Sequence, residues 1–563
     1  MHKLIPVLLL ALLFLRAGAQ DTDLLLNHPV YHYLDRLDIQ GLTDTLVPNS
    51  VRPMDRATVA QLLRRSRRHA SSGSRLLAGW HERMEWLVND SLAQPAYKGL
   101  WNTFYTNKRD LGRVKQGPLE LYINPILHTS LGVDRNDFPT AGSPNLPLYY
   151  NSRGLMIRGS LYGKVGFQTE VFDNILRVPQ FVYDHFAAQR TLPGETRVKT
   201  FGDQNGVDFL GSRAYLTFRP IPAVRLKFGK DRAFWGNGFQ SLSLSDHAAD
   251  YLFLNLTTRI WRLTYVNHFT QLTDFIPNWN DNYGRLPKKF AVFHQLTYHP
   301  WNNFSFSLFE SLVYQPSLPN GLRGPEWSYF NPVIFFRAAE QVFGSSDNAF
   351  LGAQAKWNFL QRFQLYGQFL IDDVNIGIRD QGSGYYGNKI GWQLGGRYID
   401  VAGVEGLDFQ AEYNRLRPFT YQHFSVSANY SHYGQSLGHS FGANLYDMHL
   451  ILRYQPKPAW NLYASYSMTA QGLDSASVNF GGDIGRVYTN RVGDFNHEVT
   501  QGNRLDIQQF YGRISYQLMR SDNYLEGEVR YRRERDQAGL YSQQSFSLML
   551  GLRAHLSPRR FLY

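Results

Sequence analysis

The chain has 563 residues, no cysteine and a net charge of +12, so disulfides, thiolate metal sites and a lipid attached to an N-terminal cysteine are excluded. Mean hydropathy is -0.37 and no long apolar run follows the first twenty residues, which excludes a helical membrane protein. Aromatic residues make up 15% of the chain and 48 residues are glycine, a composition that favours many strands joined by turns.

The first twenty residues have the pattern of a secretory signal. Lys3 precedes an apolar run over residues 4–15, and small residues stand at Ala17 and Ala19. This run is shorter than the roughly 20 residues that a membrane-spanning helix needs. We therefore expect a signal peptide over residues 1–19, cleaved between Ala19 and Gln20, and a mature chain that leaves the cytoplasm.

Residues 20–100 are expected to form an N-terminal helical segment on the periplasmic side, because apolar residues recur there at helical spacing. The first of three short helices is predicted over 29–39 and ends at Gly41. The second follows Pro53, and the third starts after Ser74. A basic run, interpreted as a solvated helix end, closes the second helix: Arg64, Arg65, Arg67 and Arg68.

From about residue 119 onward, apolar and polar residues alternate over segments of about ten residues separated by turn-forming clusters. In the last segment Phe546, Leu548 and Leu550 share one face, with Ala554 and Leu556 further along it, while Ser547 and Arg553 lie on the other. One face suits lipid and the other suits water. About 18 such segments can be counted, so residues 101–563 are predicted to form an all-β transmembrane barrel of 18 antiparallel strands in the outer membrane.

A barrel of this size has a wide lumen unless loops or another segment fill it. The longer irregular stretches are interpreted as extracellular loops or plugs: 133–147, 174–208, 270–288, 315–348 and 470–503. The chain ends in Phe561, Leu562 and Tyr563. A terminal aromatic residue that closes an alternating strand is the expected signal for the barrel-assembly machinery, which is therefore a predicted partner.

The stretch FGKDRAFWGNGFQSLSLSDHA offers the residue types that grip a sugar. A tryptophan ring stacks on the apolar face of a sugar while charged and amide groups bond its hydroxyls. The candidates for this role are Asp231, Arg232, Trp235 and Asn237. The alternative interpretation, a tryptophan of the aromatic belt beside a charged turn, also explains the pattern.

Two further polar clusters are candidate ligand-binding elements. Arg337 and Glu340 stand at helical spacing and are interpreted as a short plug helix that pairs its own charges, and Arg417 in the stretch EYNRLRPFTYQHF is a further candidate. His432 and His439 lie in a polar, glycine-rich stretch that also holds Ser440, Asn444 and His449. A lipid hydrolase would use a serine and a histidine there, but no G-x-S-x-G elbow surrounds Ser440, and the histidines lack metal-ligand spacing. We therefore expect a polar loop or lumen wall, with no enzyme activity, catalytic residue, metal or cofactor.

Several stretches resemble the Wzi-type capsule-assembly family, most closely its branch in gliding bacteria that includes the gliding motility protein RemB. They are the two stretches around residues 235 and 337, EYNRLRPFTYQHF (412–424), YSHYGQSLGHSFGANLYDMHL (430–450) and the N-terminal PVYHYLDRLDIQGLTDTLVPNSVRPMDRATVAQLL (29–63). The resemblance implies an 18-stranded outer-membrane barrel preceded by a periplasmic helical bundle, and a lectin-like role in holding capsular polysaccharide to the cell. Its gliding branch implies a link to motility and adhesion. It supplies no residue-level binding motif.

Together these observations predict a non-enzymatic outer-membrane barrel that binds or anchors capsular or other surface polysaccharide. The excess of basic residues favours an acidic glycan over nucleic acid, which an exported protein rarely meets. Further expected partners are outer-membrane lipid and proteins of a motility or adhesion apparatus. Two alternatives stay open: a surface component of gliding or adhesion machinery, and an anion-selective channel or exporter.

Overall fold

The computed structural model of the chain describes these residues: 22–43, 47–90, 109–138, 143–189, 191–202, 205–274, 286–314, 317–318, 321–322, 327–331, 333–335, 347–374, 384–519, 521–539 and 541–561. The signal-cleavage residues Ala19 and Gln20 lie outside them, as do Arg337 and Glu340.

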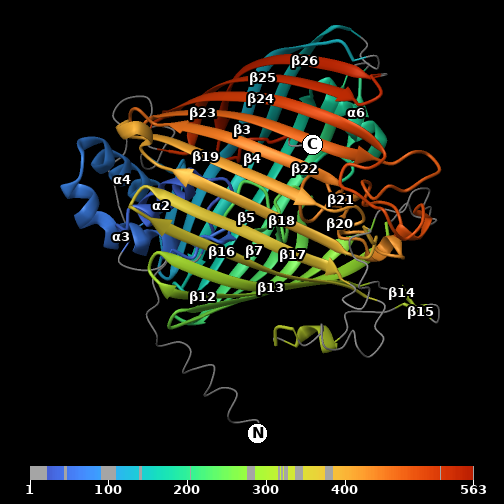
Figure 1. Cartoon of the computed structure of the whole chain (residues 1–563). Coiled ribbons are helices and arrows are strands. Elements are labelled where there is room, and N and C mark those ends of the chain that lie inside the picture. Colours follow the sequence, from blue (N-terminus) through green and yellow to red (C-terminus); the bar gives the residue numbers. More distant parts are fainter. Residues whose placement is uncertain are drawn as a thin grey trace.

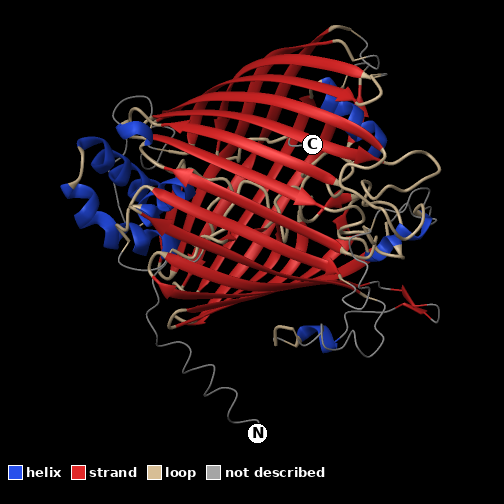
Figure 2. Cartoon of the chain, in the orientation of Figure 1, coloured by secondary structure: helices blue, strands red, loops and turns tan. Residues whose placement is uncertain are grey.

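The strands close into an antiparallel barrel of 18 strands, as the alternation predicts (Figures 1 and 2). The barrel closes where the last strand pairs with the first, with Leu550 opposite Leu131. In order around the wall, the strands are β3 (Leu119–Asn136), β4 (Asn145–Leu161), β5 (Val165–Arg177), β7 (Gly206–Ile221), β8 (Val224–Asp231), β10 (Tyr251–Ile260), β11 (Leu263–Thr273), β12 (Lys288–Trp301), β13 (Phe304–Tyr314), β16 (Asn348–Phe359), β17 (Phe363–Asp373), β18 (Lys389–Tyr398), β19 (Leu407–Leu416), β22 (Leu445–Tyr454), β23 (Trp460–Leu473), β24 (Asn503–Leu518), β25 (Asn523–Asp536) and β26 (Ser542–Ala554).

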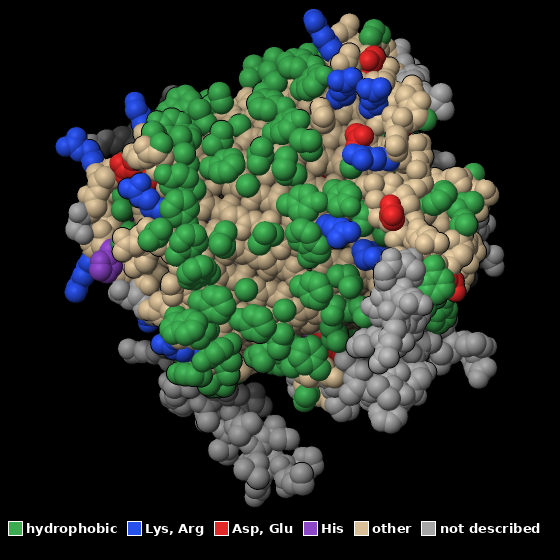
Figure 3. All heavy atoms as spheres, in the orientation of Figure 1, with side chains coloured by type: hydrophobic (Ala, Val, Ile, Leu, Met, Phe, Trp, Pro, Cys, Tyr) green, Lys and Arg blue, Asp and Glu red, His purple; other side chains and the backbone are tan. Residues whose placement is uncertain are grey.

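Apolar side chains cover the outside of the wall, and polar side chains point into the lumen. On β26, Leu548 and Leu550 are 45% and 65% exposed, whereas Ser547 and Arg553 are buried inside the barrel. The face drawn in Figure 3 carries a broad apolar band, and most of its charged side chains lie towards the two ends of the barrel. This arrangement is that of an outer-membrane barrel whose apolar band faces lipid.

The two ends of the barrel differ in the length of their connections. At one end the strands are joined by turns of two to eight residues, and at the other by loops of five to 33 residues. Short turns face the periplasm and long loops the outside in bacterial barrels. The N-terminal helices lie at the short-turn end (Figure 1), which is therefore the periplasmic end.

The N-terminal segment, residues 22–90, contains the three helices predicted from the sequence: α2 (Val30–Ile39), α3 (Arg56–Ser72) and α4 (Arg75–Val88). Asp55 caps α3 by accepting a hydrogen bond from the Thr58 amide, and Ser74 caps α4 in the same way. Helix α3 runs to Ser72, so the basic run lies within the helix and does not end it. Among the described residues no helix is long and apolar enough to cross a bilayer.

The remaining elements are short and lie beside the wall strands, in the loops or inside the lumen. They are β1 (Val51–Arg52) paired with β9 (Phe234–Trp235), β2 (Gly112–Gln116) with β3, β6 (Lys199–Phe201) with β7, β14 (Ser317–Leu318) with β15 (Gly321–Leu322), β20 (Ser431–His432) with β21 (Gln435–Ser436), the helix α6 (Gln180–Gln189), and the 3-10 turns η1 (Trp327–Phe330), η4 (Val401–Gly403), η5 (Val426–Ala428) and η6 (Tyr488–Asn490).

The C-terminal tail, residues 555–561, does not continue the last strand. Strand β26 ends at Ala554, and the next apolar residue, Leu556, is buried on the lumen side against Ile126 and Phe172. The prediction that Leu556 faces lipid is therefore wrong, because the chain turns inward at the periplasmic rim. Leu562 and Tyr563 lie outside the described residues.

Candidate functional site

Two inner loops, residues 232–250 and 417–444, fold back from the extracellular end into the lumen. Their apolar side chains form one core with the inner face of the wall, centred on Trp235, which is 0% exposed. Hydrogen bonds tie the two loops together. The Tyr421 hydroxyl donates to the Leu242 carbonyl at 2.7 Å, and the Ser245 amide donates to the Leu437 carbonyl at 2.7 Å. The inner loops are therefore a packed plug.

The N-terminal segment meets this plug from the periplasmic end. Strand β1 pairs with β9 of the first inner loop, with Val51 opposite Trp235. Ion pairs fasten the segment to the wall: Arg225 lies 2.8 Å from Asp23, and Lys356 lies 2.7 Å from Asp38. The lumen is thus filled from both ends by chain segments that contact each other.

The tail completes the filling. Arg559 pairs with Glu195, in the extracellular loop 178–205, at 3.3 Å, and Arg560 approaches Asp246 of the first inner loop at 3.8 Å. Phe561 packs into an apolar cluster that includes Phe181 of α6. A tail that begins at the periplasmic rim therefore reaches loops rooted at the opposite end.

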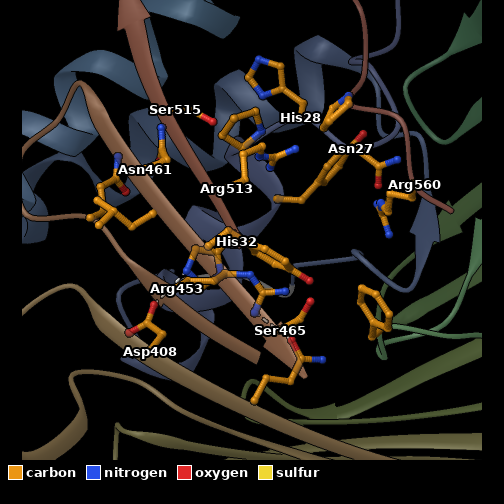
Figure 4. A pocket seen from close by; sticks show the side chains of 18 of the residues that line it. Asn27, His28, His32, Asp408, Arg453, Asn461, Ser465, Arg513, Ser515 and Arg560 are labelled. Atoms are coloured by element: carbon orange, nitrogen blue, oxygen red, sulfur yellow. Dashed lines mark hydrogen bonds and ion pairs between the residues drawn. The ribbon is translucent and has the colours of Figure 1, made fainter. Parts of the chain in front are cut away.

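A cavity of about 240 Å³ lies between the plug and the β22–β26 part of the wall. We call it the chamber. Helix α2, wall strands and the tail all supply side chains to it; Figure 4 shows His32 of α2, Arg453 and Arg513 of the wall, and Arg560 of the tail around the same space. Nine arginines line the chamber against only two aspartates. Such a lining attracts anions.

Six of these arginines have a carboxylate partner. Arg36 pairs with Asp400, Arg52 and Arg397 with Asp35, Arg553 with Glu526, Arg559 with Glu195, and Arg560 with Asp246. Burial alone would raise the pKa of Asp35, but Arg397, Arg52 and Lys356 outweigh it and lower that pKa. The Asp35 carboxyl is therefore charged at neutral pH, and these six pairs largely neutralise each other.

Arg453 and Arg513 are different. They stand on β22 and β24 on either side of Tyr463 on β23, each directly opposite it in the strand register. Their guanidinium groups lie 5.5 Å and 5.8 Å from the centre of the Tyr463 ring. Within the described chain Arg453 has no carboxylate in ion-pair range, and Arg513 has only Glu526 at 4.0 Å, a group already held by Arg553. Arg453 donates to the Gln410 side-chain carbonyl at 2.9 Å, and Glu528 on β25 lies opposite Arg513 in the strand register. The two arginines that flank the Tyr463 ring therefore have fewer close carboxylates than the other six.

Arg530, on β25, lies beside the chamber at the next level of the wall, opposite Tyr511. It is 7% exposed, and its guanidinium contacts the rings of Tyr511, Phe561 and Phe181 at 5.2 to 5.6 Å. Among the described residues it has no hydrogen-bond or ion-pair partner, and its Nε is fully buried. Each buried donor without a hydrogen-bond partner destabilises the fold by about 1–3 kcal/mol, whereas a buried cation–π contact stabilises it by about 2 kcal/mol. This guanidinium, which has five N–H donors, is therefore underpaired.

The candidate residues chosen from the sequence are placed elsewhere. Of the seven that the structure describes, none lines the chamber. The indole of Trp235 packs against Phe293 and His268 with ring centres 6.0 and 6.1 Å apart. It has no face open to a sugar, and Trp235 packs as a core residue of the plug.

The other candidates near Trp235 hold the plug in place. Arg232 pairs with Asp250 at 3.0 Å, and Asp231 accepts from Lys227 at 3.2 Å. The backbone carbonyl of Asn237 accepts from Arg397 at 2.6 Å. Arg417 donates to the Tyr385 carbonyl at 3.2 Å. Arg232 and Asn237 thus make structural contacts in the first inner loop beside Trp235, whereas Asp231 ends wall strand β8 and pairs with Lys227 of that strand.

The polar cluster around Ser440 is also packed inside the plug. His439 is buried and lies 2.9 Å from Asp447, which His449 also contacts at 2.6 Å. The Gln240 amide donates to the Ser440 hydroxyl at 2.8 Å, and the Asn444 amide donates to backbone carbonyls. His432 accepts from the Thr273 amide at 2.8 Å. The part of the chain that the structure describes contains no cluster of three or more residues suited to hold a metal.

Sequence reasoning missed the chamber arginines as a group. The alternation pattern places Arg553 on the polar face of its strand but does not distinguish it from other lumen residues. A count of arginines on the lumen face of the last five strands would have singled out this part of the wall: Arg453, Arg513, Arg530, Arg532 and Arg553.

No family model matches the chain, and no curated protein matches it in sequence. The fold is similar to that of solved outer-membrane barrels. Wzi of Escherichia coli, described as an outer membrane protein involved in group 1 capsule assembly and as a carbohydrate-binding β-barrel, superposes with a TM-score of 0.55 at 14% identity, over 95% of this chain and 99% of Wzi. OprD of Pseudomonas aeruginosa has a TM-score of 0.39 at 12% identity, over 77% of this chain and 96% of OprD. OccK8 (OprE) of the same organism has 0.41 at 11%, over 77% and 98%.

Proposed function

We propose that this outer-membrane barrel is a non-enzymatic binder that holds an acidic surface polysaccharide to the cell. The observation that carries the proposal is the chamber, where nine arginines and several tyrosines surround a cavity inside the barrel. Arginine is suited to bind carboxylate and phosphate groups of a glycan. The likeness of the fold to Wzi, which is described as carbohydrate-binding, agrees with this function.

The filled lumen favours binding over conduction. The inner loops, the N-terminal segment and the tail meet inside the barrel, and ion pairs and hydrogen bonds join them. Free diffusion of a solute would require these contacts to separate. An anion-selective channel is the alternative, and stable conductance steps from the full-length protein in planar bilayers would favour it.

The resemblance of the sequence to the branch of gliding bacteria extends the proposal. A barrel that grips polysaccharide at the cell surface would also serve adhesion during gliding. In that case the protein should co-purify with motility or adhesion proteins from detergent-solubilised outer membranes. If the protein binds polysaccharide but co-purifies with no such partner, its function is limited to holding polysaccharide on the cell.

Calorimetry tests the main proposal. Full-length, detergent-folded protein is titrated with polysaccharide extracted from the surface of the cell that produces it, and with the same polysaccharide after its carboxyl groups have been reduced. Saturable binding that weakens after reduction is expected, because the arginines require an anion. Absence of binding to the native polysaccharide at high concentration would refute the proposal.

A further inference from the structure

The inference concerns Arg453, Arg513 and Arg530, which have no carboxylate of their own at hydrogen-bond distance among the described residues, and it rests on the function proposed above. Arg453 and Arg513 lie in one cross-strand row, and Arg530 lies one row further along the wall. Rows on the same face of a strand are about 7 Å apart. The three guanidinium groups therefore surround one part of the chamber at two levels.

We propose that the chamber binds the anionic group of an acidic sugar, a uronate carboxylate or a sugar phosphate, and receives it from the periplasmic end of the barrel, before the polysaccharide that carries it reaches the cell surface. Arg453 and Arg513 hold the anion from the two sides of Tyr463. Arg530 contacts the anion from the row of residues one step nearer the extracellular end. There the anion supplies the partner that the Arg530 guanidinium lacks within the described chain.

The walls beside these arginines suit a sugar rather than a bare ion. Asn461 and Ser465 stand two residues before and after Tyr463 on β23, and both face the chamber (Figure 4). Their side chains make no hydrogen bond with the described residues. The Asn461 amide, which can both donate and accept, and the Ser465 hydroxyl are therefore available to bond sugar hydroxyls. A cavity of about 240 Å³ holds about eight water molecules, which exceeds the space that a phosphate ion fills.

The position of the chamber indicates the direction of entry. Its lining includes Tyr454 and Gln455, at the periplasmic end of β22, and Trp80 of α4, which lies at the same end of the barrel. Towards the outside, Phe561 of the tail and Phe181 of α6 pack together in an apolar cluster. Charged sugars do not cross such a cluster readily, so the periplasmic rim is the favoured entrance.

Calorimetry with small probes tests the ligand class. The full-length protein is titrated with glucuronate, glucose 1-phosphate, glucose and inorganic phosphate. Saturable binding is expected for glucuronate or glucose 1-phosphate, and whichever binds identifies the anion. Binding of glucose as tight as that of glucuronate would overturn the anionic requirement. Inorganic phosphate binding as tightly as glucose 1-phosphate would overturn the assignment to a sugar.

Variants test the site. Arg453→Gln, Arg513→Gln and Arg530→Gln should each weaken binding at least about tenfold, because each removes a charge-assisted hydrogen bond. Arg504→Gln is the matched control, since Arg504 lies on the same strand as Arg513 but pairs with Asp506 at the extracellular end. Arg453 is partly exposed, so its variant separates loss of binding from loss of folding. Unchanged affinity in the folded Arg453→Gln and Arg513→Gln variants would overturn the inference.

A single introduced cysteine tests the entrance, because the native chain has none. In Asn461→Cys cells, a maleimide that cannot cross the outer membrane should react only after that membrane is permeabilised, and the bound probe should slow the reaction. Arg504→Cys, at the extracellular end, should react in intact cells. Rapid labelling of Asn461→Cys in intact cells would overturn entry from the periplasm.

Failure of this inference and failure of the proposed function are distinguishable. A protein that binds surface polysaccharide but neither anionic probe overturns the inference and leaves the proposed function standing. A protein that binds a probe through these arginines but does not bind the polysaccharide supports the chamber site and removes the proposed function.

Discussion

The guanidinium Nη1 of Arg559 lies 3.3 Å from the carboxylate Oε1 of Glu195, across 364 residues of sequence. Arg559 belongs to a tail that leaves the wall at the periplasmic rim, and Glu195 belongs to an extracellular loop. Both side chains are largely buried. This pair links the two ends of the barrel through its lumen, so tail and loop are expected to be ordered together.

Removal of one partner should therefore loosen both segments. Loss of one member of a buried ion pair costs about 3–5 kcal/mol, because the other charge is left uncompensated. Arg559→Gln and Glu195→Gln should each increase hydrogen exchange in the tail and in loop 178–205. The double variant should be less affected than the sum of the two, since no lone charge remains. Strictly additive effects would mean that the two side chains are not coupled.

The contact between the N-terminal segment and the first inner loop predicts a disulfide. Arg52 lies opposite Phe234 in the β1–β9 pair, and opposed Cα atoms in antiparallel strands are about 4.5–5.5 Å apart, within disulfide range. Arg52→Cys combined with Phe234→Cys should cross-link on oxidation and shift the mobility of the unfolded chain in a non-reducing gel. Arg52→Cys combined with Ile260→Cys, which points outward on β10, is the control and should not react. Equal yields from both pairs would contradict the placement of β1.

Trp235 should matter for stability rather than for ligand contact. Truncation of a buried tryptophan to alanine costs about 3–5 kcal/mol, so Trp235→Ala should make the inner loops sensitive to protease. Trp235→Phe keeps most of the apolar volume and should retain both protease resistance and polysaccharide affinity. A Trp235→Phe protein that is fully resistant to protease but has lost affinity would restore the sugar-stacking role.

The wall and the N-terminal helices could be predicted from the sequence because their signals are local. Alternation along β26 and the caps at Gly41 and Ser74 are read within about ten residues of chain. The placement of residues 232–250 inside the lumen could not be predicted in this way. This stretch combines Trp235 with glycine and serine, a composition equally suited to a sugar-binding loop and to a plug. Its partners, such as Tyr421, are more than 170 residues away.

The same limit explains the chamber. Alternation correctly places Arg553 in the lumen, but whether an arginine has a carboxylate partner depends on neighbours from other strands and from the plug. Arg553 is held by Glu526, 27 residues earlier, whereas Arg530 stands beside rings of α6 and the tail. Pairing of charges in three dimensions separates a structural arginine from a binding one.

Acid should loosen the second inner loop. Burial lowers the pKa of His432 from 6.5 to about 3, and the neutral ring suits its site because one nitrogen accepts from the Thr273 amide and the other faces the Asp250 carbonyl. A histidine whose pKa is lowered by folding stabilises the fold fully above pH 6.5 and loses this contribution as the pH falls towards 3.

Protease cleavage within residues 417–444 should therefore increase as the pH falls from 7.5 to 4. His432→Gln cannot titrate and should weaken this dependence. The His432→Gln change should not abolish the pH dependence of cleavage, since burial also lowers the pKa of His247 and His423 to about 4. A pH dependence identical in His432→Gln and the native protein would exclude a contribution of His432.

The most direct test of polysaccharide retention is made on cells. A strain that lacks the protein is complemented with the native chain, with the Arg453→Gln, Arg513→Gln double variant, or with Arg504→Gln, and cell-bound and released polysaccharide are measured separately. The account predicts equal total polysaccharide in all strains, release into the medium in the deletion and double-variant strains, and retention with the native chain and Arg504→Gln. Equal cell-bound polysaccharide in the deletion and native strains would contradict it.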